Sequence, residues 1–111
     1  MGDLDLLKQS CKPLKGPENR LAEDDLEGYL PAIPGWRVVD GELHKQFRFD
    51  NYYETIAFVN ALAFVAHRCE HHPDLEVHYN RVLVRYSTHD VGGVSMNDLI
   101  CAAKADALIG V

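Results

Sequence analysis

Histidine is concentrated in one short stretch of this chain. Three of its six histidines (His67, His71 and His72) fall within six residues, and His89 follows two runs of β-type alternation. Imidazole has an unperturbed pKa near ~6.5, so it can both donate and accept protons at neutral pH. A reaction that removes one proton and delivers another to a leaving hydroxyl needs two such groups in one pocket. His71 or His72, with His89 opposite, would meet that need.

A metal site is the main alternative use of the same residues. His67 and His71 are four residues apart, which places both on one face of a helix, as in many zinc sites. His89 or Glu70 would then supply a third ligand. A single His-xxx-His pair is a weak signal, however, and no second close pair occurs. Acid–base catalysis without a metal is therefore favoured, and the remaining alternative is that these histidines are only polar residues near loops.

The hydrophobic pattern predicts the elements that position the histidines. Residues 52–69 are apolar around most of a helical circumference, which predicts a helix buried on more than one side. Asn51 is expected to cap this helix, with Glu54 reaching back to it. Pro73 disfavours helical geometry in the residue before it, so His72 should lie just past the helix.

Strand-like alternation flanks this helix on both sides. Residues 36–49 alternate around Asp40-Gly41, a strong hairpin turn, and residues 75–86 predict a second hairpin that places Tyr79 on the apolar face of a strand. Residues 21–30 predict a short first helix, and Ser95 with Asp98 resembles a capping box before a helix that ends near residue 109. The order α-β-β-α-β-β-α predicts an α+β fold, a four-stranded antiparallel sheet with helices packed on one face.

Length and composition indicate a single domain spanning residues 1–111, in which residues 1–20 form a loosely ordered N-terminal arm. A net charge of −6 argues against direct nucleic-acid binding, and no apolar run is long enough for a membrane helix. The acidic start lacks the features of a signal peptide. Cys11, Cys69 and Cys101 are widely spaced, which fits reduced thiols and a cytoplasmic protein, and neither Cys69 nor Cys101 lies in a nucleophile motif.

Several spaced elements together resemble one known family. His67-xxx-His71-His72-Pro73, followed by Tyr79, His89 and Asp98 at their present spacings, is similar to the signature of the pterin-4a-carbinolamine dehydratases. The runs Gly35-Trp36, Lys45-Gln46-Phe47 and Ser87-Thr88-His89 also fall where that family carries similar residues. The resemblance extends over residues 21–108, nearly the whole chain, and the family's fold agrees with the predicted α+β order.

The resemblance implies a reaction and a site. Members of the family remove water from 4a-hydroxytetrahydrobiopterin and yield quinonoid dihydropterin, with no metal and no organic cofactor. By position, His71, His72 and His89 would be the catalytic histidines, with His71 and His89 as the acid–base pair and His72 orienting the pterin. The substrate-binding residues are then expected to be Glu70, Pro73, Asp98 and His67, although Asp98 would equally serve as a helix cap.

The resemblance also implies a rival function of another class. Animal members act as dimerisation cofactors for a transcription factor, and other dehydratase-like proteins assist Rubisco assembly, so a non-catalytic binding module is the alternative reading. Retention of all three histidines in this chain favours the enzyme. The apolar breadth of residues 52–69 further predicts self-association as a homodimer or homotetramer.

Overall fold

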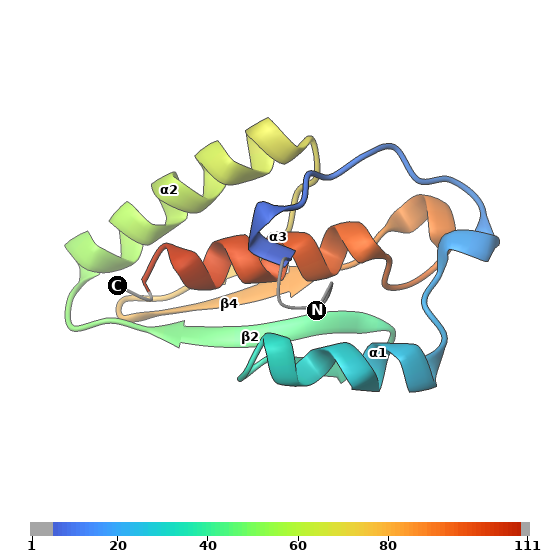
Figure 1. The fold of residues 1–111 in the computed structure, drawn as a ribbon. Coiled ribbons are helices and arrows are strands. Elements are labelled where there is room, and N and C mark those ends of the chain that lie inside the picture. The colour runs from blue at the N-terminus through green and yellow to red at the C-terminus, as the bar shows by residue number, and fades with distance from the viewer. Residues whose placement is uncertain (1–5, 110–111) are drawn as a thin grey trace.

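The computed structural model describes residues 6–109. Three α-helices and four β-strands follow one another along the chain in the order α1, β1, β2, α2, β3, β4, α3 (Figure 1). Their bounds are α1 Glu23–Tyr29, β1 Arg37–Val39, β2 Glu42–Arg48, α2 Tyr52–Cys69, β3 Asp74–Val77, β4 Arg81–Tyr86 and α3 Met96–Ala107. Short 3₁₀ helices are η2 Pro17–Asn19, η3 Leu30–Ala32 and η4 His89–Val91.

The four strands form one antiparallel sheet in the order β1-β2-β4-β3. Alternate residues of β4 are buried, and these are Val82, Val84 and Tyr86. Helices α2 and α3 both contact β4 and lie on the same side of the sheet (Figure 1). The predicted α+β fold, with a four-stranded antiparallel sheet and helices on one face, is therefore confirmed.

Apolar side chains from all layers meet between the sheet and the helices. The fully buried members include Ile33, Leu43, Leu62, Val84 and Leu99. Trp36 packs edge-on against Phe47 and its indole N–H donates to Asp106 Oδ1 over 3.1 Å. Because this core fixes both α2 and β4, it also fixes the two chain segments that carry the histidines.

Local sequence signals determine where the central elements begin and end. Asp40 and Gly41 both have positive φ, as a two-residue hairpin turn requires. Asn51 caps α2 by accepting the Glu54 N–H at 2.9 Å, as predicted. The Glu54 carboxylate, however, accepts from the Asp50 N–H rather than reaching back to Asn51.

Tyr79 differs from its predicted position. Strand β3 ends at Val77, so Tyr79 lies in the turn before β4 and its side chain is 65% exposed. Its ring stacks on that of Tyr52 at the start of α2, with centroids 6.1 Å apart. The alternation of apolar and polar residues that predicted a strand therefore continues beyond Val77, the last residue of β3 that pairs with β4.

The segment predicted to be a loose arm packs closely where the structure describes it, from residue 6 onward; residues 1–5 of that prediction lie outside the described residues. Leu6 is buried in the core, and Lys12 and Asn97 exchange two hydrogen bonds of 3.1 and 2.7 Å. Lys104 donates to the carbonyl oxygen of Leu7. The segment crosses α3 and passes the end of α2 before it turns to α1 (Figure 1).

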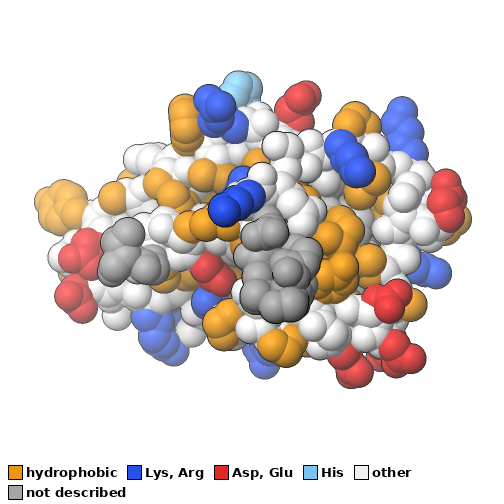
Figure 2. Space-filling model, viewed as in Figure 1, with side chains coloured by type: hydrophobic (Ala, Val, Ile, Leu, Met, Phe, Trp, Pro, Cys, Tyr) orange, Lys and Arg blue, Asp and Glu red, His pale blue; other side chains and the backbone are white. Residues whose placement is uncertain are grey.

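The surface on the side of α2 and α3 is mixed in character. Acidic, basic and hydrophobic side chains are interspersed over this face rather than gathered by sign (Figure 2). Within residues 6–109, no helix combines the length and the apolar character that crossing a membrane requires.

Candidate functional site

A histidine–carboxylate pair joins the exit of α2 to the start of α3. His71 lies two residues past the end of α2, and its Nε2 is 2.5 Å from Oδ1 of Asp98 in the first turn of α3. The His71 side chain is 14% exposed and that of Asp98 is fully buried. One edge of the imidazole is thus held by a buried carboxylate, while the ring remains close to the surface.

The second oxygen of Asp98 is fully engaged by the loop before α3. Asp98 Oδ2 accepts from the Thr88 hydroxyl at 2.8 Å and from the Ser95 N–H at 2.9 Å. Thr88 Oγ1 is also 2.6 Å from Ser95 Oγ. Because the single Thr88 hydroxyl proton goes to Asp98, the Ser95 hydroxyl donates to Thr88. Asp98 is therefore both the helix cap and the partner of His71.

The surroundings of His71 favour its protonated form. The hydrogen bond to Asp98 raises the pKa of His71 above its ordinary value of 6.5, and partial burial opposes this rise. The imidazole also stacks on the ring of Tyr86, with centroids 6.0 Å apart and planes 13° from parallel. The Tyr86 side chain is buried and its pKa is strongly raised by that burial. The uncharged ring of Tyr86 packs against one face of the imidazole and the Asp98 carboxylate binds its edge, and together they fix the plane of the His71 ring.

A left-handed residue directs His71 into this position. Helix α2 ends at Cys69, and Glu70 has φ 52° and ψ 39°. The His71 N–H donates to the Ala66 carbonyl and the Glu70 N–H to the His67 carbonyl, which together form a Schellman motif. Glycine usually occupies this left-handed position, and a side chain there is strained. The strain falls at the residue before the paired histidine.

Two cavities meet at Glu70. The first, of about 240 Å³, is lined by His71, Glu70 and Thr88 together with residues of the N-terminal segment. The second, wider one is lined by His67, Arg68, Glu70 and His72. Glu70 therefore lies between the paired histidine and the two other histidines of the cluster.

The remaining predicted residues lie at the rim of this region. His72 and His67 are exposed, and Pro73, half-buried, leads directly into β3. His89 is exposed at the start of η4, between Thr88 and Asp90, which both line the smaller cavity. The structure thus joins His71 to Asp98 directly and places Glu70 in the same cavity as His71, while His72, His67 and His89 are exposed.

Three residues of this region were given no role in the site by sequence reasoning. Thr88 and Ser95 complete the hydrogen bonding of Asp98, and Tyr86 provides the stacking surface for His71. The Ser-x-x-Asp capping signal located Ser95 and Asp98 but gave no indication of a histidine partner. Only the contact between α3 and the exit of α2 reveals that partner.

Relatives of known sequence share almost the whole chain. Residues 19–108 match the family described as Pterin 4 alpha carbinolamine dehydratase. A protein provisionally named pterin-4-alpha-carbinolamine dehydratase in Stenotrophomonas maltophilia (strain K279a) is 58% identical, over 97% of this chain and 96% of the relative. A protein of the same provisional name in Xanthomonas campestris pv. campestris (strain B100) is 57% identical, over 97% and 94% respectively.

Solved structures share the fold. A transcriptional coactivator/pterin dehydratase from Brucella melitensis superposes with a TM-score of 0.78 at 34% identity, covering 81% of this chain and 98% of that one. A pterin dehydratase-like protein identified as a RuBisCO assembly factor in the alpha-carboxysome superposes with a TM-score of 0.60 at 29% identity, covering 69% and 92%. With the family match over residues 19–108 and relatives identical at more than half of their positions, this chain belongs to the pterin 4 alpha carbinolamine dehydratase family.

Proposed function

We propose that this chain is an enzyme that dehydrates 4a-hydroxytetrahydrobiopterin to quinonoid dihydropterin and water, and so recycles the pterin of aromatic amino acid hydroxylases. In this reaction the C4a–O bond breaks, the hydroxyl leaves as water after it gains a proton, and N5 loses its proton. No electrons enter or leave the substrate. The observation that supports the proposal most is the half-buried His71, bonded to a buried carboxylate beside a cavity.

His71 is suited to the acid role. Its carboxylate partner stabilises the imidazolium and raises the pKa of the ring above its ordinary value, which favours the protonated form that can deliver a proton to the departing C4a hydroxyl. Asp98 is fully buried with both oxygens occupied, so it acts through His71 as a positioning residue rather than by touching the pterin.

His89 then takes the N5 proton as general base. It is exposed beside Thr88, which belongs to the same hydrogen-bonded group as Asp98. His72, in the adjoining cavity with His67 and Glu70, orients the pterin ring, and Pro73 fixes the loop that carries it. Exposed side chains around the fixed His71 imidazole suit a substrate that must enter and leave the site without a large rearrangement of the protein.

A second function has specific support in the outer face of α2. Tyr53 is 86% exposed and Phe64 is 63% exposed, although both lie on a long helix rich in apolar residues. Such a face indicates burial against another chain. We therefore propose that α2 mediates a homodimer or homotetramer, with a binding module for a protein partner as the alternative to catalysis.

The free cysteines agree with a cytoplasmic setting for this reaction, which we also propose. The test is the rate at which 4a-hydroxytetrahydropterin loses water, followed by absorbance, with and without the purified protein. The expected result is strong acceleration over the spontaneous reaction, which persists in the presence of a chelator and is lost in His89→Ala. A folded protein that gives no acceleration would contradict the enzyme and favour the binding module.

A further inference from the structure

Three cysteines from distant parts of the sequence converge beside the His71 cavity. Cys11 comes from the N-terminal segment, Cys69 is the last residue of α2, and Cys101 is buried in α3. Their sulfur atoms all lie within 4.8 Å of one another, and those of Cys11 and Cys101 are 3.5 Å apart. These are all three cysteines of the chain. A disulfide would use only two of them and leave the third unexplained.

The spacing of the sulfurs is that of a thiolate metal site. Zinc binds cysteine sulfur at about 2.3 Å with tetrahedral geometry, which places neighbouring sulfurs about 3.8 Å apart. The sulfurs of Cys11 and Cys101 are slightly closer than this value and all three lie within 4.8 Å, so small side-chain movements would bring the three sulfurs to an ion. Sulfur donors of this kind select zinc-like and other thiophilic metals over magnesium or calcium.

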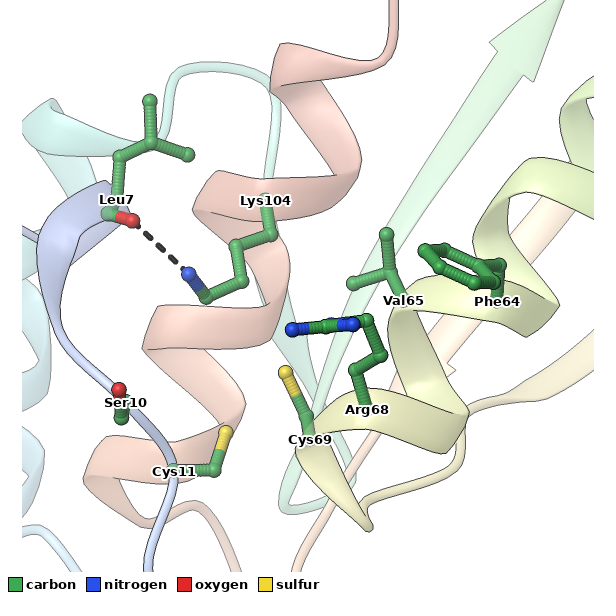
Figure 3. A pocket seen from close by; sticks show the side chains of 8 residues that line it. All are labelled: Leu7, Ser10, Cys11, Phe64, Val65, Arg68, Cys69 and Lys104. Atoms are coloured by element: carbon green, nitrogen blue, oxygen red, sulfur yellow. Dashed lines mark hydrogen bonds between the residues drawn. The ribbon is translucent and has the colours of Figure 1, made fainter.

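Nearby basic residues can balance the net charge of such a complex. Three thiolates and one divalent cation carry a net charge of −1, and the adjacent cavity of about 430 Å³ is lined by Arg68 and Lys104 as well as Cys11 and Cys69. The guanidinium of Arg68 lies beside the Cys69 sulfur (Figure 3).

We propose that Cys11, Cys69 and Cys101 bind one thiophilic divalent ion of the zinc class. The ion joins the N-terminal segment to the ends of α2 and α3. Residues next to Cys11 line the smaller cavity, and Cys69 precedes Glu70 and His71. The site is therefore structural: it fixes one wall of the His71 cavity and takes no part in proton transfer.

The test is metal binding by the full chain after reduction and removal of metals with a chelator. Zn²⁺ is expected to bind at one ion per chain and to raise the Tm, and Co²⁺ is expected to give the charge-transfer absorption of cobalt–thiolate bonds. Cys11→Ser and Cys69→Ser should each weaken Zn²⁺ binding by more than about 100-fold, the upper end of the effect of losing an outer-shell partner.

Two matched controls distinguish the three-cysteine site from a general disturbance of the cavity and from the alternative His67–His71 metal site. Ser10→Ala alters the residue next to Cys11 in the same cavity, and His67→Ala removes a ligand of the histidine site; both should bind Zn²⁺ like the unaltered chain. Absence of stoichiometric binding would overturn the proposal, as would loss of binding in His67→Ala. Two further results would overturn the proposal. One is a reduced protein that binds Cu⁺ but not Zn²⁺. The other is a chain that binds no Zn²⁺ and forms a disulfide between Cys11 and Cys101.

Discussion

His71 and His72 are adjacent in the sequence and lie in opposite environments. The His71 side chain is 14% exposed, is bonded to Asp98 and is stacked on Tyr86. His72 is exposed and, within the described part of the chain, has no side-chain hydrogen bond. The left-handed conformation of Glu70 turns the chain so that the first histidine points toward α3. The second histidine, His72, remains exposed at the surface.

This difference indicates how one short motif can supply two functions. A buried carboxylate fixes the orientation and the protonation of one imidazole, at the cost of its freedom to move. The exposed neighbour is free to follow a ligand. In the proposed enzyme, proton transfer belongs to the fixed histidine and substrate orientation to the free one.

The largest expected effect concerns catalysis. His71→Ala should lower kcat for pterin dehydration by about 10²- to 10⁴-fold, the usual contribution of a general acid. His72→Ala should mainly raise KM. Steady-state kinetics would measure both, with His78→Ala, an exposed histidine after β3, as the control. Equal losses of kcat in His71→Ala and His72→Ala would remove the distinction between the two residues.

Stability should be most sensitive to the partner of His71. Asp98→Ala leaves the imidazole, the Thr88 hydroxyl and the Ser95 N–H without their acceptor in a buried place. The free energy of unfolding should fall by about 3 kcal/mol or more, as measured by urea denaturation. The control is Asp90→Ala, which removes an exposed carboxylate that lines the His71 cavity and should change stability little. A small effect in Asp98→Ala would mean that the hydrogen-bonded group rearranges easily.

The His71–Asp98 pair should also make stability depend on pH. Because the pKa of His71 is higher in the folded chain than its ordinary value of 6.5, the pair stabilises the fold fully below about pH 6.5. That contribution is lost as pH rises through the folded-state pKa. The difference in unfolding free energy between the unaltered chain and His71→Ala should therefore shrink with rising pH. A difference that grew with pH would contradict the assigned direction.

The smallest expected effect is an increase in stability. Glu70→Gly relieves the left-handed strain and should stabilise the chain by up to about 1 kcal/mol in urea denaturation. Glu76→Gly, at an exposed and extended position in β3, should destabilise it instead. If Glu70→Gly also lowers the dehydration rate, the strained residue contributes to the placement of His71 or to the pterin site.

Local sequence signals predicted the elements well because their causes are local. The bounds of α2 follow from its apolar run and from Asn51 and Pro73, and the first hairpin follows from Asp40-Gly41. The capping pattern correctly predicted the start of α3 at Ser95 and Asp98. These features depend on residues within about one turn of one another.

What the sequence did not reveal depends on contacts between distant segments. Asp98 meets His71 across 27 residues, and Cys11 meets Cys101 across 90. The N-terminal segment carries no periodic pattern, yet Lys12 is held by Asn97 on α3. Such contacts arise from the packing of elements, and hydrophobic periodicity carries no information about them. The family resemblance named the histidines but not the network that fixes one of them.

The pH dependence of kcat for the dehydration tests the central claim most directly, because His71 must be protonated to deliver a proton to the leaving hydroxyl. With the raised pKa of His71, kcat should decline as pH rises through an apparent value above 6.5. The same decline should begin at lower pH in Asp98→Asn, which lacks the carboxylate. A kcat that stays constant or rises across this range in the unaltered chain would contradict a protonated His71 as the acid.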